Sequence, residues 1–350
     1  MKVAVYTIAK NEAQFVNRWA ESCQDADYRV ICDTGSTDET VALGQAAGVA
    51  VDTVIVDPWR FDHARNVALS MVPEDADYCI ALDMDEVLVP GWREALEWAL
   101  EAGWTRPRYQ YTWSWNDDGT PGLVYGGDKI HARHGYRWKH PVHEVILADG
   151  IETQGWVGLE IHHFPDHAKS RGQYFPLLRL AVREDPDDDR NAYYYARELY
   201  FHGHYDEAIV EFKRHLALPR ATWEPERAAS MRYLAKMLPG DRERWLLRAA
   251  GECPSRREPW VDLAAHYYTA GDWPSCHAAA VRALSIGQKP LEYICEAFAW
   301  GSAPHDFAAI SAYHLGLSDQ AVQHGENALA LEPGDARLQQ NLNWYSSKVS

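Results

Sequence analysis

Short apolar segments alternate with amphipathic segments over the first half of the chain. The pattern predicts strands at residues 2–8, 29–32, 51–56 and 78–82, separated by helices at residues 11–22, 39–47 and 61–71. In the first of these helices, Phe15, Val16 and Trp19 fall on one face. The β-α-β-α order is typical of an α/β fold with a doubly wound, mostly parallel sheet.

Further along, residues 109–115 alternate between apolar and polar positions, turn at 116–119 and return at 123–125, which predicts a hairpin. Residues 157–163 predict another strand. Its alternation places Leu159, Ile161 and His163 on one face and His162 on the other.

After the acidic segment at 185–189, the apolar positions follow helical spacing only. Around Gly203, Gly271 and Gly316, small and large apolar residues recur at the spacing of tetratricopeptide (TPR) repeats, in which paired helices nest and stack. A shorter, less regular unit spans residues 228–254, and a generic helical bundle is the alternative. We therefore expect an α/β catalytic domain at 1–183 and an all-α, TPR-like domain at 184–350.

Composition narrows the class of protein. Apolar residues make up 47% of the 350 residues, as in a globular protein, and the net charge of −17 argues against broad binding to nucleic acids or anionic membranes. There is no apolar run of membrane-spanning length and no signal-peptide pattern. The six cysteines lack CxxC spacing, which favours reduced thiols and a cytoplasmic location.

Three carboxylates, Asp83, Asp85 and Glu86, directly follow the apolar strand predicted at 78–82. Carboxylates this close raise each other's pKa unless a cation lies among them. Oxygen ligands of this type suit Mg²⁺ or Mn²⁺, and the carboxyl end of a strand in an open α/β sheet is where ligands bind. A solvated acidic turn is the alternative interpretation.

Four segments in order resemble the motifs of family 2 glycosyltransferases, which have the GT-A fold. They are Thr7-Ile8-Ala9-Lys10-Asn11-Glu12, the run Asp33 to Thr40 (DTGSTDET), the run Trp59 to Leu69 (WRFDHARNVAL) and Asp83-Met84-Asp85-Glu86. The resemblance covers about the first 165 residues. Fusion to TPR helices is similar to bacterial and phage members, including those that glycosylate peptide side chains.

The resemblance implies a nucleotide-sugar donor, with a UDP-sugar favoured, and Mn²⁺ or Mg²⁺ as cofactor. Asp85 is implied as a metal ligand with a catalytic role, and His163 as a second metal ligand. For Arg65, an ion pair with Asp62 on the same helix is the alternative. The residues implied to bind the donor are Thr7, Ala9, Asn11, Glu12, Asp33, Arg65, Asp83 and Met84.

Glu144 lies in a "VHE" segment that the same families carry, and it is the candidate general base that deprotonates the acceptor. An ordinary core or surface glutamate is the alternative, and Asp117 and Asp118 are rival bases. After His163, the family's usual Tyr-Gly is replaced by Phe164-Pro165, which changes the expected local loop.

The predicted function is metal-dependent, inverting transfer of a sugar to an unidentified acceptor, with a protein, peptide or glycan favoured over nucleic acid. For the helical domain we expect a role in recognition or assembly, which includes a possible homodimer. Two other classes stay open: a TPR scaffold with an inactive GT-A half, and a nucleotidyltransferase. The second usually carries a Gly-rich phosphate loop, which is not seen after residues 2–8.

Overall fold

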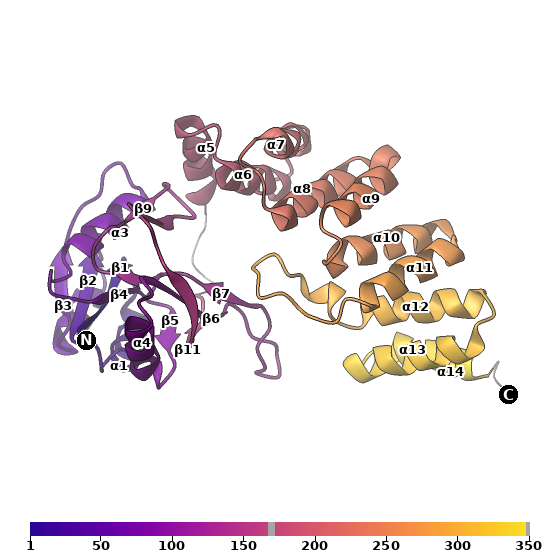
Figure 1. Cartoon of the computed structure of the whole chain (residues 1–350), viewed down its shortest axis with the longest axis horizontal. Coiled ribbons are helices and arrows are strands. Elements are labelled where there is room, and N and C mark those ends of the chain that lie inside the picture. The colour runs from indigo at the N-terminus through magenta and orange to yellow at the C-terminus, as the bar shows by residue number, and fades with distance from the viewer. Residues whose placement is uncertain (167–171, 348–350) are drawn as a thin grey trace. The chain divides into compact units, whose positions relative to one another are not determined.

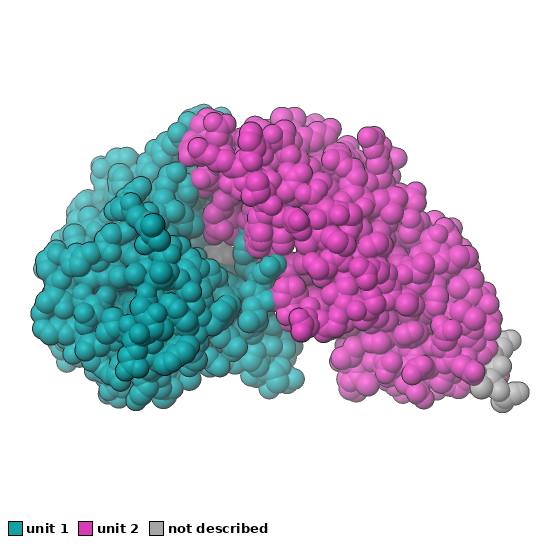
Figure 2. Space-filling view, viewed as in Figure 1, with its two compact units in different colours: residues 1–184, 291–293 teal, residues 185–290, 294–350 magenta. Residues whose placement is uncertain are grey.

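The protein is described by a computed structural model covering residues 1–166 and 172–347. It forms two compact units, one of residues 1–184 with 291–293 and one of residues 185–290 with 294–350 (Figure 2). The first unit combines helices with mixed sheets and the second is helical (Figure 1). The predicted fold class, α/β followed by helical repeats, is therefore confirmed.

The main sheet of the first unit has the strand order β3-β2-β1-β4-β8. Its strands are β1 (Val3–Ala9), β2 (Tyr28–Asp33), β3 (Ala50–Thr53), β4 (Tyr78–Ala81) and β8 (Ile130–Ala132). The first four are parallel, as predicted, and β8 runs antiparallel to β4. Strand β3 ends at Thr53 and is shorter than the predicted 51–56. Thr53 pairs with Asp33, and because β2 ends at Asp33, the residues after Thr53 have no partner strand.

Both faces of the central strands β1 and β4 are covered, so these two strands are almost entirely buried and mostly apolar. On one face, Val5 of β1 packs in a cluster with Trp19 of the first helix. On the other face, Tyr6 packs in a cluster with Leu69 of the helix that precedes β4. The helices of this region are α1 (Ala13–Ser22), α2 (Thr40–Ala46), α3 (Phe61–Ser70), α4 (Trp92–Glu101) and, at the end of the unit, α5 (Tyr174–Glu184).

A second sheet has the order β5-β11-β6-β7, and two strands pair separately as the hairpin β9-β10. These strands are β5 (Glu86–Leu88), β6 (Arg106–Thr112), β7 (Val124–Gly127), β9 (Tyr136–Lys139), β10 (Val145–Ala148) and β11 (Gln154–His163). The predicted hairpin is β6 with β7. In β11, Leu159, Ile161 and His163 are buried while His162 is partly exposed, so the predicted alternation is confirmed.

The register of β11 positions the candidate site. His163, the last residue of β11, lies opposite Glu86, the first residue of β5. Strand β5 follows β4 after a short acidic turn, so this pairing places the end of β11 beside the carboxylates that follow β4.

The second unit consists of consecutive helices that pack as neighbouring pairs (Figure 1). Gly203, Gly271 and Gly316 have φ of 78°, 70° and 75° and follow the first helix of three pairs, where a left-handed residue ends a helix. The predicted repeats around these glycines, and the shorter unit α8–α9, are confirmed. The helices are α6 (Asp189–Phe201), α7 (Tyr205–Ala217), α8 (Glu224–Met237), α9 (Arg242–Glu252), α10 (Arg257–Ala270), α11 (Trp273–Leu284), α12 (Ala303–His314), α13 (Ser318–Leu331) and α14 (Ala336–Ser346).

All six cysteines are free and buried. Within residues 1–166 and 172–347, every helix is too short or too polar to cross a membrane.

Candidate functional site

The carboxyl ends of the parallel strands β1, β2 and β4 carry the polar residues that the sequence singled out. Asp33 ends β2, and its carboxylate accepts hydrogen bonds from the backbone N–H of Gly35 (3.1 Å) and Ser36 (3.2 Å) and from the hydroxyl of Thr53 (3.2 Å). Asp33 is buried, and these bonds shape the loop after β2. In this arrangement the hydrogen-bonding partners of the Asp33 carboxylate are groups of the protein itself.

Asn11 joins the loop after β1 to the loop after β2. Its side-chain Oδ1 accepts from the N–H of Thr37 at 2.7 Å, and its own N–H donates to the Ser36 hydroxyl at 2.8 Å. Asn11 has a φ of 57°, a left-handed conformation that asparagine tolerates better than most residues. The two loops therefore form one rigid rim at this edge of the sheet.

The other residues expected to bind a donor are buried at the ends of β1 and β4. Thr7 donates its hydroxyl hydrogen to the carbonyl of Ile8, and the carbonyl of Ala9 accepts from Thr34. The N–H of Glu12 donates to the Thr40 hydroxyl at 2.8 Å. The side chains of Thr7, Ala9, Glu12 and Met84 are all buried, so a ligand at this edge would meet their backbone before their side chains.

Asp83 lies between two cations. Its Oδ1 is 2.8 Å from Nη2 of Arg65, and its Oδ2 is 2.7 Å from Nζ of Lys129. Burial alone would raise the pKa of Asp83, but the charges of Arg65 and Lys129 outweigh it and hold that pKa well below its usual range. Asp83 is therefore a carboxylate already neutralised by the protein.

Glu86, with a relative exposure of 1%, shares the same lysine. Its Oε1 accepts from Lys129 at 2.8 Å and from the hydroxyl of Tyr111 at 2.6 Å, and its Oε2 accepts from the N–H of Asp83 at 2.8 Å. Burial raises the pKa of Glu86. The Asp83 and Glu86 charges in turn raise the pKa of Lys129 well above its usual value, although burial alone would lower it.

Arg65 of α3 is the central cation of the site. Besides Asp83, its guanidinium pairs through Nε with Oε1 of Glu144, and it lies 4.9 Å from the ring centroid of Trp138. The alternative, an ion pair between Arg65 and Asp62, is wrong. Asp62 instead pairs with Arg60, whose Nη2 lies 2.9 Å from Oδ2 of Asp62. Nη1 of Arg65 is buried, and it has no hydrogen-bond partner among the residues that the structure describes.

Asp85 contacts the end of β11 and the residue that follows it. Its Oδ2 lies 3.3 Å from Nε2 of His163, and its backbone carbonyl accepts from the N–H of Phe164 at 2.8 Å. Burial lowers the pKa of His163, but its contact with Asp85 outweighs this effect and raises the pKa overall. The structure thus brings together the two residues predicted as metal ligands.

The rival bases lie on an exposed turn. Asp118 accepts from the N–H of Thr120 at 2.9 Å, and the N–H of Gly119 donates to the carbonyl of Asn116 at 2.9 Å. Asp117 and Asp118 are both exposed, and these bonds confirm the turn predicted at 116–119. Glu144 is the candidate base that lies beside Arg65.

The donor set at Asp85 and His163 fits a divalent cation. One carboxylate oxygen and one imidazole nitrogen face each other, and both are accepted ligand types for such ions. Across residues 1–166 and 172–347, no cluster of three or more histidine, cysteine or acidic side chains is arranged to hold a metal. The two residues would therefore leave most coordination positions for oxygens of a substrate or water, as Mg²⁺ usually does.

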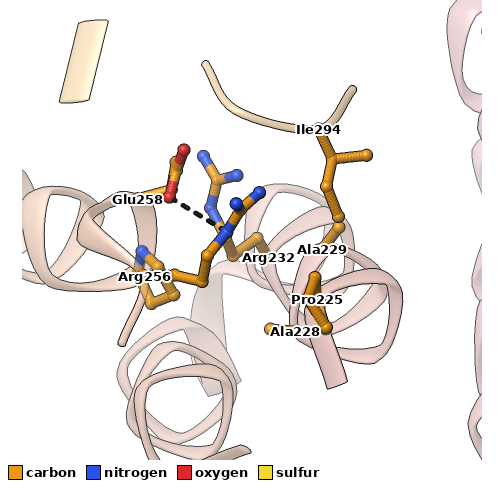
Figure 3. A pocket seen from close by; sticks show the side chains of 8 residues that line it. Pro225, Ala228, Ala229, Arg232, Arg256, Glu258 and Ile294 are labelled. Carbon is orange, nitrogen blue, oxygen red and sulfur yellow. Dashed lines mark ion pairs between the residues drawn. The ribbon is translucent and has the colours of Figure 1, made fainter. Parts of the chain in front are cut away.

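The helical unit contains a small cavity of its own. It encloses about 10 Å³ and is lined by residues that include Arg232, Arg256 and Glu258, with Nε of Arg256 3.5 Å from Oε2 of Glu258 (Figure 3). Such a volume holds about one water molecule. It is too small for a nucleotide or a sugar.

Lys129 is a residue of the candidate site that the sequence analysis did not single out. It precedes β8, whose first residue Ile130 pairs with Ile80 of β4, and this pairing brings the lysine over the acidic turn. The sequence signal for Lys129 is its place directly before a short strand. Pairing between two strands about fifty residues apart is not visible in the local pattern.

Comparison with models of protein families gives no match. Among curated proteins, the chain is 28% identical over 183 residues to the lipopolysaccharide core biosynthesis glycosyltransferase LpsC of Rhizobium meliloti (strain 1021). The match covers 47% of this chain and 64% of LpsC, so the chain spans less than two thirds of that relative. The predicted resemblance to a glycosyltransferase followed by TPR-like repeats is thereby confirmed, with the second unit supplying the helix pairs.

Two solved structures also align in part. A TPR protein of Thermus thermophilus aligns with 17% identity over 50% of this chain and 88% of its own, at a TM-score of 0.33. Glucosyl-3-phosphoglycerate synthase of Mycobacterium tuberculosis, solved with Mn²⁺, UDP-glucose and phosphoglyceric acid, aligns with 23% identity over 31% and 44%, at a TM-score of 0.27. Both TM-scores are below 0.5, so neither structure supports an inference about the site.

Proposed function

We propose that this chain is a metal-dependent glycosyltransferase of family 2 that transfers a sugar from a nucleoside-diphosphate sugar, with a UDP-sugar favoured. The observation that carries the proposal is the guanidinium of Arg65. It is buried at the strand edge beside Asp83, and its Nη1 finds no partner in the described part of the chain. A buried donor without an acceptor is costly, and a ligand oxygen at this edge would satisfy it.

The chemistry of this strand edge fits two parts of such a donor, the charged diphosphate and the nucleoside. A guanidinium binds phosphate oxygens through several parallel N–H groups, which suits the diphosphate. Carboxylates such as Asp83 accept hydrogen bonds from ribose hydroxyls or from a base N–H. For Asp83 to do so, its contacts with Arg65 and Lys129 would have to be shared with the nucleotide.

The residues that would hold the cation are Asp85 and His163, since their side chains face each other at 3.3 Å. A bound Mn²⁺ or Mg²⁺ would neutralise the negative charge that develops on the departing nucleoside diphosphate. Asp85 is better placed for this role than Asp83 or Glu86, because both of those carboxylates are neutralised by Lys129.

Glu144 is the proposed general base. In the transfer step, the acceptor oxygen forms a bond to the anomeric carbon and its proton passes to Glu144. The bond from that carbon to the diphosphate oxygen breaks at the same time, and the configuration inverts. The pairing of Oε1 with Arg65 leaves Oε2 of Glu144 to take the proton. Similarity to LpsC, whose name describes lipopolysaccharide core synthesis, supports a carbohydrate acceptor.

For the helical unit we propose recognition or assembly without chemistry, including pairing of two copies through its helices. Stacked helix pairs present an extended surface that suits such roles. Buried free thiols throughout the chain support a reducing, cytoplasmic location. Light scattering of the full chain measures the oligomeric state; a monomer would contradict the pairing.

A thermal-shift screen of the full chain against nucleotide-sugars with Mn²⁺ tests the proposal. A donor at a hundred times its dissociation constant adds about 2.7 kcal/mol to the free energy of unfolding. We expect one class of UDP-sugar to stabilise the protein and to be slowly hydrolysed. Pyrophosphate release from a nucleoside triphosphate would indicate a nucleotidyltransferase, and the absence of both effects would indicate a scaffold.

A further inference from the structure

The imidazole of His163 is held by the segment that follows β6. Its Nδ1 lies 2.9 Å from the carbonyl oxygen of Trp113. A carbonyl oxygen only accepts hydrogen bonds, so Nδ1 carries a proton in this contact. Nε2 faces a carboxylate oxygen of Asp85, also an acceptor, at the longer distance of 3.3 Å. In the neutral ring, the shorter contact to the backbone keeps the proton on Nδ1 and leaves Nε2 as the nitrogen that can bind a cation beside Asp85.

The indole of Trp113 also fixes the orientation of this ring. It stacks on the imidazole with centroids 4.4 Å apart and planes inclined by 22°. Turning the imidazole about its Cβ–Cγ bond would drive its edge into the indole. The stack therefore opposes any rotation that would carry Nε2 away from Asp85.

Trp115 contacts the backbone at the end of β11. Its Nε1 donates to the carbonyl of His163 at 3.1 Å, and its ring stacks on Phe164 with centroids 5.6 Å apart and planes inclined by 5°. The N–H of Phe164 in turn donates to the carbonyl of Asp85 at 2.8 Å. The end of β11 is thereby joined to the acidic turn on one side and to Trp115 on the other.

We propose that Trp113 and Trp115 are positioning residues, which hold Nε2 of His163 toward the position that a cation shared with Asp85 would take. The inference rests on the proposed function for the identity of the cation bound there. Contacts to the second nitrogen of a metal-binding histidine orient the ring, and loss of such outer contacts typically weakens metal binding by about 10–100-fold. Removing the indole of Trp113 leaves its carbonyl in place but allows the imidazole to turn, so we expect a loss at the lower end of that range, about 10-fold.

The first measurement needs neither metal nor activity. Nitrogen-15 spectra of the histidine rings, recorded on the metal-free full chain at a pH where the imidazoles are neutral, report which nitrogen carries the proton. His163 is assigned by its absence in His163→Asn. A proton on Nδ1 is expected in the wild type and in Trp113→Phe, with a mixture of tautomers in Trp113→Leu. A proton on Nε2 in the wild type would overturn the inference.

The second measurement is Mn²⁺ affinity in the presence of UDP, followed by electron paramagnetic resonance. Trp113→Leu should weaken binding by about 10-fold or more, while Trp113→Phe, which keeps a stacking ring, should bind nearly as the wild type does. Trp115→Phe removes the indole N–H but keeps the ring, and it should also bind more weakly. Trp156→Leu is the matched control, because Trp156 lies on β11 with half of its surface exposed.

The outcomes separate this inference from the proposed function. If wild-type protein fails to bind Mn²⁺, the proposed metal dependence fails, while the tautomer of His163 in the wild type and in Trp113→Leu still decides the role of Trp113. If wild-type protein binds Mn²⁺ and Trp113→Leu binds it equally well with an unchanged tautomer, the positioning role is wrong and the metal site stands.

Discussion

The ammonium group of Lys129 lies 2.7 Å from Oδ2 of Asp83, so a lysine from outside the acidic turn neutralises the first of its carboxylates. The same ammonium is 2.8 Å from Glu86. Three adjacent acidic residues need a nearby cation, and for two of them the protein supplies it. Asp85 is left as the carboxylate that faces His163.

Replacing Lys129 with methionine should therefore destabilise the first unit. Removing one partner of a fully buried ion pair costs about 3–5 kcal/mol, and we expect about 2–3 kcal/mol here. The reduction reflects partial solvation, since the side chains of Lys129 and Asp83 are 24% and 29% exposed. Hydrogen exchange of the β4 amides measures the change. Unaltered exchange, with Lys2→Met as the exposed control, would show that the lysine is not needed.

Glu144→Gln should lower the rate of sugar transfer by roughly 10²–10⁴ while leaving donor affinity nearly unchanged. The amide oxygen of glutamine can still accept from Nε of Arg65, so the guanidinium should keep its place. Transfer rates with a defined acceptor and nuclear magnetic resonance of the product provide the test. Wild-type turnover in Glu144→Gln would exclude it as the base, and a product with retained configuration would exclude direct displacement.

The first unit should also lose stability in mild acid through His131. This residue is fully buried, and burial lowers its pKa from 6.5 to about 4. In the neutral ring, Nδ1 donates to the carbonyl of Ala132 (2.8 Å) and Nε2 accepts from the hydroxyl of Tyr6 (3.0 Å). Because the folded pKa is the lower one, its stabilising effect is complete above pH 6.5 and is lost as the pH falls toward 4.

The expected loss is about 3 kcal/mol by pH 4, and about 2 kcal/mol of it falls between pH 7 and pH 5. Hydrogen exchange of the β8 amides between pH 7 and pH 5, compared with His131→Asn, isolates this contribution. The wild type should weaken with falling pH more steeply than the variant. Titration of the His131 ring near pH 6.5 in the folded protein would contradict the prediction.

The sequence was sufficient to predict the regular parts of the fold, for physical reasons that individual elements show. Strand β4 is apolar on both faces because the sheet is covered on both sides, and the repeats around Gly203, Gly271 and Gly316 follow from helical spacing with a left-handed residue after the helix. Local spacing carries both signals. The predicted end of β3 is wrong, because the length of β3 depends on where its partner β2 ends, which local spacing does not show.

The site was less accessible to prediction because its decisive contacts join distant segments. Asp85 and His163 were both identified, yet their approach depends on the register of β11 against β5. The pairing of Arg65 with Glu144, and the position of Lys129, depend on how separate loops and strands fold onto the same edge. Charge pattern within a helix suggested Asp62 for Arg65, but the neighbouring Arg60 already satisfies that carboxylate.

The most direct test of the account is donor hydrolysis by full-length Asp85→Asn, measured as nucleoside diphosphate released from the preferred UDP-sugar with added Mn²⁺. We predict that wild-type turnover disappears in excess chelator and returns with Mn²⁺, and that Asp85→Asn stays folded but inactive at any Mn²⁺ concentration. Asp117→Asn, on the exposed turn, is the matched control and should keep wild-type turnover. Wild-type turnover by Asp85→Asn in excess chelator would contradict the central claim.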